Sequence, residues 1–360
     1  MEGTMSSFRE LARALAGLTA VLLFPAFAAD TTQAQPHPAR DWKEYPAVVS
    51  ATTTEDIYAI GDAHGDYEHL ERVMKAAGII AEITPGPETA RWSAGKAVLV
   101  TTGDMIDKGP RAPDVIRLLR NLREQAAAAG GRVIILAGNH EAEFLANPAA
   151  PKGKDFAAQM KSLHTEPADV AQCKGEFGEF LCSLSFGARV DKWYFSHAGY
   201  TKGMSLDQIE SFVEGAFAAH GYAAKELVAP DSLMRADLTR KEDGATPWID
   251  WKMPGKSEKE VLERNTRALG VEHIVQGHVP SDVVFADGVI RNHGEMFQRY
   301  GKLFLIDTGM SRGVDDSDGA ALYLPHGGEK AIAVCADGTR TLLWDENSGQ
   351  DVGRAHACGR

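Results

Sequence analysis

The sequence has few cysteines, no excess of positive charge and no apolar run long enough to span a bilayer comfortably, at the N-terminus or after it. Lys and Arg number 38 against 50 Asp and Glu among 360 residues, which gives a formal net charge of −12. An acidic chain repels nucleic-acid phosphates, so we expect no nucleic-acid partner. Apolar residues make up 44% and charged residues 24%, a balance that excludes collagen, disorder and a polytopic membrane protein.

The four cysteines, Cys173, Cys182, Cys335 and Cys358, form no Cys-x-x-Cys pair, so the sequence indicates neither a zinc ribbon nor a redox-active dithiol. In an oxidising compartment, a Cys173–Cys182 bridge would close a short loop and a Cys335–Cys358 bridge would pin the C-terminal tail. Four cysteines allow three pairings, and the sequence does not choose among them.

The N-terminus combines positive charge, a short apolar stretch from Ala14 to Phe24 and the tripeptide Ala26-Phe27-Ala28. These are the three parts of a secretory signal peptide, and the apolar stretch is too short to span a bilayer comfortably. We expect residues 1–28 to be a signal peptide and residues 29–50 a leader or linker. The expected location is periplasmic or secreted, without stable membrane insertion after cleavage; the alternative is an uncleaved anchor or a surface helix.

From Ile57 onward, short β-type runs alternate with amphipathic helical patterns. Strands are predicted at 57–60, 97–101, 133–136, 193–195, 273–275, 303–306, 321–324, 331–334 and 341–344. A capping box at Ser257 and Glu260 predicts a helix start. The order predicts an α/β sandwich of two mixed β-sheets flanked by helices. We expect a catalytic domain at 51–345 with helical or loop cap insertions at about 151–190 and 200–256, followed by a C-terminal tail at 346–360.

Polar clusters follow five of the predicted strands. They are Gly61-Asp62-Ala63-His64-Gly65-Asp66, Gly103-Asp104-Met105-Ile106-Asp107-Lys108-Gly109-Pro110, Gly138-Asn139-His140-Glu141, His197-Ala198-Gly199 and Gly277-His278. Ligands of an α/β sheet bind at the carboxyl ends of the strands, so we expect these clusters to converge. Oxygen and nitrogen donors without cysteine suit Mn, Fe or Zn, and six ligands suit two divalent cations that share a carboxylate.

Each cluster taken alone has a simpler interpretation. Gly-Asp is common in turns, which would explain Asp62 and Asp104 without any metal. A single histidine such as His197 or His278 is more often a hydrogen-bonded partly buried residue than a ligand. The occurrence of all five clusters in order at strand ends favours the metal interpretation.

The ordered motifs GDAHGD, GDMIDKG, GNHE, HAG and GH resemble the phosphoprotein phosphatase branch of the calcineurin-like metallophosphoesterases over about residues 57–310. The resemblance implies that Asp62 and His64 hold one cation, Asp104 bridges, and Asn139, His197 and His278 hold the second. It also implies that His140 is the catalytic acid and that Asp107 orients it. The wider superfamily often ends in Gly-His-x-His, whereas this chain reads Gly277-His278-Val279-Pro280, which fits the phosphoprotein phosphatase branch better.

Substrate binding is where the chain departs from that family. An arginine usually follows the Asp107 position, and here Lys108 supplies the charge without the planar fork of a guanidinium. Arg111 or Arg235 could supply the missing fork, and we select Arg235. Lys108 and Arg235 are therefore the predicted phosphate-binding residues.

The sequence predicts a dinuclear metal-dependent phosphomonoesterase, a protein phosphatase acting on Ser/Thr or Tyr phosphate by direct attack of metal-bound hydroxide. Its substrate would be a phosphorylated protein or peptide or a small phosphomonoester. The alternative is a dinucleoside polyphosphate (diadenosine tetraphosphate) hydrolase, whose members share the Asp107–Arg111 stretch although many lack the acid at position 107. A metal-stabilised binding protein without catalysis is a third possibility, against which the His140–Asp107 pair argues.

Overall fold

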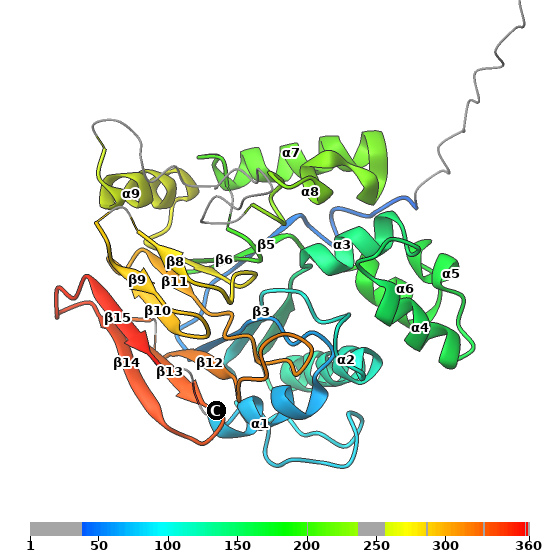
Figure 1. Cartoon of the computed structure of the whole chain (residues 1–360), viewed down its shortest axis with the longest axis horizontal. Coiled ribbons are helices and arrows are strands. Elements are labelled where there is room, and N and C mark those ends of the chain that lie inside the picture. Colours follow the sequence, from blue (N-terminus) through cyan, green and yellow to red (C-terminus); the bar gives the residue numbers. More distant parts are fainter. Residues whose placement is uncertain are drawn as a thin grey trace, which may run out of the picture. The chain divides into compact units, whose positions relative to one another are not determined.

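A computed structural model describes residues 38–199, 201–236, 256–285, 287–326, 328–356 and 358. The predicted signal peptide at 1–28 lies outside these residues, as does the part of the second cap insertion from 237 to 255. Two large β-sheets and the helices around them make up the described fold (Figure 1). This is the predicted α/β sandwich of two mixed sheets, so the fold class is confirmed.

The first sheet has six strands in the order β14-β13-β12-β2-β3-β4. Its strands are β2 (Ile57–Ile60), β3 (Val98–Thr101), β4 (Arg132–Ile135), β12 (Ala320–Leu324), β13 (Lys330–Cys335) and β14 (Arg340–Asp345). Strands β2, β3 and β4 run parallel, whereas β12 pairs antiparallel with β2 and begins an antiparallel half. The parallel half therefore presents the ends of β2, β3 and β4 side by side.

The second sheet has seven strands in the order β1-β5-β6-β7-β11-β10-β15. They are β1 (Val48–Ala51), β5 (Gly187–Val190), β6 (Trp193–Ser196), β7 (His273–Gln276), β10 (Met296–Arg299), β11 (Leu303–Leu305) and β15 (Val352–Ala355). Strands β6, β7 and β11 are parallel, and the hairpin of β8 (Val283–Val284) and β9 (Ile290–Arg291) follows β7. A buried apolar layer that includes Ile57 and Val100 from one sheet and Phe195 and Phe304 from the other joins the two sheets.

Helices cover the outer faces of the sheets. They are α1 (Tyr67–Ala77), α2 (Ala112–Ala128), α3 (Asn139–Ala146), α4 (Lys154–Ser162), α5 (Pro167–Ala171), α6 (Gly175–Cys182), α7 (Leu206–His220), η1 (Gly221–Ala223), α8 (Lys225–Val228) and α9 (Glu258–Leu269). Helices α1 and α2 pack on the six-stranded sheet, and α4, α5 and α6 form a group beside α2 (Figure 1). The predicted capping box at the start of α9 is present, because Ser257 and Glu260 cap each other. None of the helices in the described ranges has the length and apolar character that a membrane crossing requires.

Three expected boundaries differ from the structure. Strand β1 begins inside the stretch predicted as a leader or linker, and β5 lies inside the first predicted cap insertion. Strand β15 lies in the predicted C-terminal tail and pairs with β10. Short strands such as β1 and β15 carry little periodicity of their own and are stabilised by neighbours distant in the sequence, so pattern alone does not detect them.

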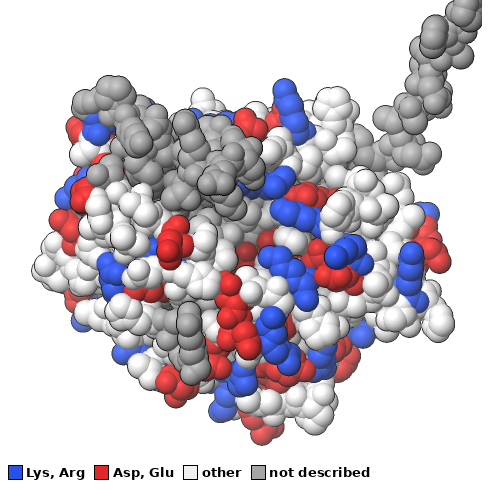
Figure 2. All heavy atoms as spheres, viewed as in Figure 1, with Lys and Arg blue, Asp and Glu red and all other residues white. Residues whose placement is uncertain are grey.

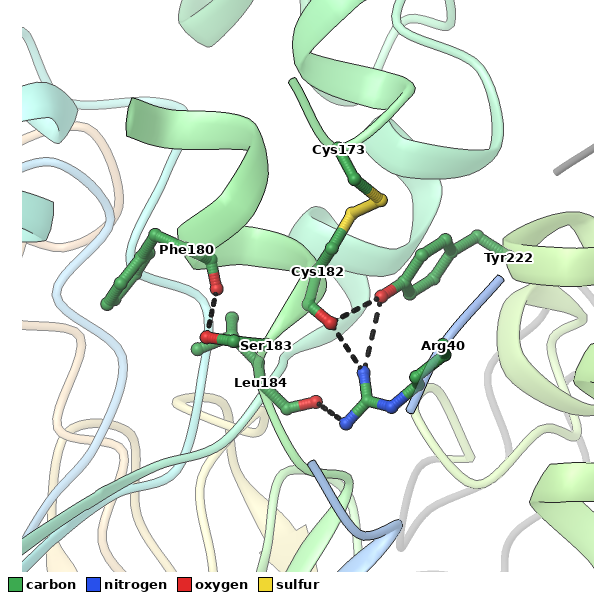
Figure 3. The surroundings of a disulfide bond; sticks show 7 residues. All are labelled: Arg40, Cys173, Phe180, Cys182, Ser183, Leu184 and Tyr222. Atoms are coloured by element: carbon green, nitrogen blue, oxygen red, sulfur yellow. Dashed lines mark hydrogen bonds between the residues drawn. A yellow bond between two sulfur atoms is a disulfide. The ribbon is translucent and has the colours of Figure 1, made fainter. Parts of the chain in front are cut away.

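Two disulfides use all four cysteines, Cys173–Cys182 and Cys335–Cys358, in the pairing that closes the shorter loops. Near the first bridge, Arg40 donates hydrogen bonds to the carbonyl oxygens of Cys182 (2.8 Å) and Leu184 (2.7 Å) and to the Tyr222 hydroxyl (3.4 Å), as Figure 3 shows. Burial lowers the pKa of Arg40, although the nearby Tyr222 opposes this shift. The segment that precedes β1 is thus held against the α6–β5 connection.

We predict that replacing Cys335 and Cys358 together by Ser lowers the free energy of unfolding by about 3 kcal/mol. The bridge joins positions separated by 23 residues, and opening it restores conformational freedom mainly to the unfolded chain. Urea denaturation of both proteins, with and without reductant, measures the difference. An unfolding midpoint that responds neither to the double substitution nor to reductant would contradict a stabilising bridge.

Candidate active site

The strand-end clusters converge on one pocket of 580 Å³. Asp62 follows β2, Asp104 follows β3, Asn139 begins the helix after β4, and His197 and His278 follow β6 and β7. The pocket is lined by His64, Asp104, Asp107, Lys108, Asn139, His140, Pro151, Lys152, Lys154, Asp155, His278, Pro280, Ser281, Asp307, Gly313 and Val314. Seven of these are residues that the sequence singled out, and both sheets contribute to the same site.

Asp104 is the centre of the site. Its Oδ2 atom lies 3.4 Å from His197 Nε2, 3.6 Å from His64 Nε2 and 4.0 Å from His140 Nε2. Two groups of three atoms able to bind a metal, each within 4.8 Å of one another, share this carboxylate. Asp104, His197 and His278 form one; Asp104, His64 and His140 form the other, in which His140 is the predicted acid and not a predicted ligand. A carboxylate common to two groups is the arrangement that two neighbouring cations require.

Backbone carbonyl groups orient the ring nitrogens of two histidines. His64 Nδ1 lies 3.1 Å from the Ile106 oxygen, and His197 Nδ1 lies 2.9 Å from the Thr102 oxygen. Each Nδ1–H donates to its carbonyl, so each Nε2 is presented toward Asp104. Outer hydrogen bonds of this kind are typical of metal-binding histidines. Asn139 joins the same group, with Oδ1 3.1 Å from His197 Nε2.

The charge balance of the pocket also fits cations. Burial and the neighbouring Asp307 carboxylate raise the pKa of Asp62 well above its usual range. Burial would likewise raise the pKa of Asp104, but the adjacent His197 and His140 hold it well below the usual range. The Lys108 ammonium lies 3.3 Å from His64 Nε2, beside the nitrogen lone pair that would otherwise bind a metal cation. The donor set present is therefore suited to a pair of divalent cations.

Asp62 lies beside the two groups rather than within them. Both of its carboxylate oxygens are 3.2 Å from the backbone N–H of His278, which donates to them. Its side chain is buried at the end of β2, next to Asp307. The assignment of Asp62 as a ligand of the first cation remains a prediction.

The predicted catalytic pair is in contact. His140 Nδ1 lies 3.0 Å from Asp107 Oδ2, so Nδ1–H donates to the carboxylate and Nε2 is the nitrogen that lies on the Asp104 side. The backbone N–H groups of Gly153, Asp155 and Phe156, at the start of α4, also donate to Asp107. Burial would raise the pKa of Asp107, but the hydrogen bonds from His140 and Gly153 lower it, and the carboxylate stays ionised. The first cap insertion thus helps hold the catalytic pair.

Glu141, the last residue of the GNHE motif, connects the two loops that carry Asp104 and Asn139. Its fully buried carboxylate accepts four backbone hydrogen bonds, from residues 104, 105, 106 and 138, at 2.7–3.1 Å. Gly138 is glycine because the loops touch there: a Cβ atom at this position would lie 2.1 Å from Asp104 Oδ1. Glu141 is therefore a positioning residue to which the sequence analysis gave no role.

Backbone strain is concentrated at the site. Five of the ten predicted site residues have a left-handed conformation, namely His64 (φ 41°), Asp104 (49°), Asp107 (70°), Lys108 (64°) and His278 (67°). Each such residue costs of order 1 kcal/mol, and strained residues of this kind cluster where function requires a particular side-chain direction. The strain supports a functional role for these loops.

The two predicted phosphate-binding residues occupy different places. Lys108 lines the pocket next to His64. Arg235 lies at its edge, where its backbone oxygen is 3.2 Å from His278 Nε2 and its Nε is 3.3 Å from Glu143 Oε1. Arg111, the other candidate for the missing fork, pairs with Glu68 at 2.6 Å and Asp114 at 2.7 Å, so those carboxylates engage its guanidinium.

Asp307 is a site residue that the sequence analysis missed. It follows β11 within Ile306-Asp307-Thr308-Gly309, lines the pocket and is 3% exposed. Its Oδ1 accepts a hydrogen bond from the Gly309 N–H at 2.9 Å, and burial raises its pKa to about 6. A partial signal was present, since an acid and a glycine follow a predicted strand, although the glycine comes before the acid at Asp62 and Asp104 and after it at Asp307.

Comparison with known proteins agrees with this geometry. A family model described as calcineurin-like phosphoesterase matches residues 56–282. An uncharacterized protein of Schizosaccharomyces pombe is 30% identical over 278 residues, 74% of each chain. Shewanella-like protein phosphatase 1 of Plasmodium berghei is 35% identical over 146 residues, 40% of this chain and 38% of that protein. The structure of a cold-active protein-tyrosine phosphatase of a psychrophilic Shewanella has a similar fold, with TM-score 0.60, 22% identity and 85% coverage of both chains.

We predict that Asp307→Asn weakens divalent-cation binding by about 10- to 100-fold, because the site loses one of its buried negative charges. The same change removes the repulsion between Asp307 and Asp62, so the cation-free protein should melt at an equal or higher temperature. Calorimetric Mn²⁺ titration and thermal unfolding without metal measure the two effects. Asp318→Asn, which removes a half-exposed carboxylate from the same loop, is the control. Unaltered Mn²⁺ affinity in Asp307→Asn would show that Asp307 does not contribute to cation binding.

Proposed function

The chain belongs to the calcineurin-like phosphoesterases, and from this premise we propose that it is a phosphomonoesterase of the phosphoprotein phosphatase type. The proposed substrate is a phosphorylated Ser, Thr or Tyr residue of a protein or peptide. The observation that carries the proposal is the His140–Asp107 pair beside the shared Asp104 carboxylate. A site that only bound metal or phosphate would need no such pair. The similarity to a Shewanella-like protein phosphatase supports the substrate class.

Two divalent cations, of Mn, Fe or Zn, would be held by Asp62, His64, Asp104, Asn139, His197 and His278. When bound, they supply an acidified water as nucleophile and offset the negative charge of the phosphoryl oxygens. Lys108 adds positive charge beside His64, and Arg235, whose Nε lies 3.3 Å from Glu143 Oε1, adds it at the edge of the pocket.

His140 supplies the proton that the leaving oxygen needs. Its Nδ1–H is held by Asp107, so the imidazole is fixed with Nε2 on the Asp104 side of the ring. Asp107 thus holds the ring in the orientation in which Nε2 is the nitrogen that gives its proton to the leaving oxygen. A serine or threonine alkoxide leaves poorly, so this proton transfer matters more for alkyl than for aryl phosphates.

A dinucleoside polyphosphate hydrolase is the alternative enzyme. Many of these enzymes lack an acid at the position of Asp107, whereas here Asp107 is hydrogen-bonded to His140 and to the start of α4. The pair therefore favours phosphomonoester hydrolysis. Comparing diadenosine tetraphosphate with phosphopeptides as substrates separates the two activities.

We predict that His140→Asn lowers kcat by about 10²- to 10⁴-fold on a phosphoserine or phosphothreonine peptide. The loss on p-nitrophenyl phosphate should be smaller, because its leaving group needs less protonation. Steady-state assays of both substrates, with metal analysis and with and without chelator, test this. Bound metal should be unchanged in the variant, and chelator should abolish wild-type turnover.

The matched control for this test is His164→Asn, which changes an exposed histidine outside the pocket. Its kinetics should equal those of the wild type. Equal losses on aryl and alkyl phosphates in His140→Asn would argue against the assigned proton donor. Full wild-type turnover after complete removal of divalent ions would overturn the proposed mechanism.

We also propose that the protein is exported through cleavage of residues 1–28. Two disulfides that use every cysteine support an oxidising compartment, because such bridges are rare in the reducing cytosol. When the full chain is expressed in a bacterial host, the protein should be recovered from the periplasm or medium with Ala29 as its first residue. Cell fractionation and intact-mass analysis test this, and a cytosolic protein that retains residues 1–28 would contradict it.

A further inference from the structure

Positive side chains surround the mouth of the pocket, although the whole chain carries a net charge of −12. Lys108, Lys152 and Lys154 line the pocket, and Arg235 lies at its edge. On the face shown in Figure 2, basic side chains gather near the centre with acidic ones between them. The carboxylates on the outer wall are Asp155, which also lines the pocket, and Glu143 beneath Lys152 and Arg235.

The Glu143 carboxylate contacts two of these basic side chains and one predicted metal ligand. Its Oε1 atom lies 3.3 Å from Lys152 Nζ, 3.3 Å from Arg235 Nε and 3.1 Å from Asn139 Nδ2. One carboxylate shared by two cations leaves a net positive charge at this place. Because Asn139 Nδ2 donates to Glu143, the amide oxygen is the atom that lies next to His197. Glu143 therefore fixes the positions of the Lys152 and Arg235 side chains relative to Asn139.

Lys154 adds an uncompensated charge on the neighbouring wall. It is the first residue of α4, is exposed, and forms no ion pair with any residue in the described part of the chain. Basic residues nearby differ, since Arg111 and Arg312 each contact two carboxylates. The backbone next to Lys154 is also rigid, because the N–H groups of Gly153 and Asp155 on either side of it bind Asp107.

We propose that Lys152 and Lys154, next to the predicted phosphate-binding residue Arg235, form an anion-binding rim that selects phosphoesters with a second negative charge beside the phosphoryl group to be cleaved. This inference rests on the proposed function and adds the substrate class. A pocket of 580 Å³ is in the middle of the range of small-molecule sites, about 300–1,000 Å³, and has room for a group next to the phosphoryl. The second charge is an acidic or phosphorylated neighbour in a phosphopeptide, or a further phosphate in a polyphosphate chain.

The physical basis is short-range electrostatics. Charges act on one another over a Debye length of about 8–10 Å at moderate salt, so a carboxylate next to the phosphorylated residue is attracted by the rim. The acidic remainder of the chain repels such substrates at longer range, so the attraction of the rim acts close to the mouth of the pocket. The preference should therefore weaken as ionic strength rises.

The test uses two phosphopeptides that differ only in Glu or Gln next to the phosphorylated residue, with the metal-loaded full protein. The wild type should prefer the Glu peptide in kcat/KM, and Lys152→Met and Lys154→Met should each reduce this preference by about threefold. Lys154→Arg, which keeps the charge, should retain it. Lys161→Met is the matched control, because it removes a lysine from the same helix outside the pocket.

A preference that is absent in the wild type, or that neither Lys152→Met nor Lys154→Met changes, would overturn the anion-binding rim. If the metal-loaded wild type cleaves no phosphopeptide but cleaves diadenosine tetraphosphate, and both lysine variants lower that rate, the rim stands and the proposed protein-phosphatase function fails. The melting temperature and metal content of every variant show whether a loss of preference comes from misfolding. A variant that has lost the preference for the Glu peptide but matches the wild type in both measurements supports the rim.

Discussion

Several carboxylates and imidazoles are buried together around Asp104, and the loops of the site are arranged to keep them there. Three histidine Nε2 atoms lie within 4.0 Å of one Asp104 oxygen, and Asp62 and Asp307 are buried beside each other nearby. Like charges in a low-dielectric interior repel strongly, and such a cluster is stable only when positive charge is shared among its members. Protons on the buried groups and the Lys108 ammonium supply part of this positive charge, and two divalent cations would supply more of it.

Hydrogen bonds to buried carboxylates hold the loops that carry these groups, in addition to the apolar packing of loop residues such as Met105 and Ile106. Glu141 binds four backbone N–H groups and thereby fixes two loops against each other, while the start of α4 binds Asp107. Both carboxylates are buried acceptors satisfied by backbone donors, which makes the loop positions specific. These hydrogen bonds offset the strain of the five residues in the site that have a left-handed backbone conformation.

The pocket is acidic at its floor and basic at its mouth. Asp62, Asp104 and Asp307 lie at strand ends, whereas Lys152 and Lys154 come from the insertion between β4 and β5. The sheet ends thus supply the predicted cation-binding groups, and the insertion supplies the backbone groups that bind Asp107. The insertion predicted as a cap therefore also lines the pocket and contacts the predicted catalytic pair.

The fold class, the central strands and the polar clusters at the strand ends follow from the sequence alone, because each cluster is a local pattern of glycine, acid and histidine after an apolar run. The sequence also indicated the His140–Asp107 pair through resemblance. Long-range contacts, by contrast, place β1 and β15 in the sheet, bring Glu141 and Glu143 to the site and pair Arg111 with acids away from it. These placements depend on contacts between residues far apart in the chain, and local periodicity carries no information about which distant partner a charged side chain meets.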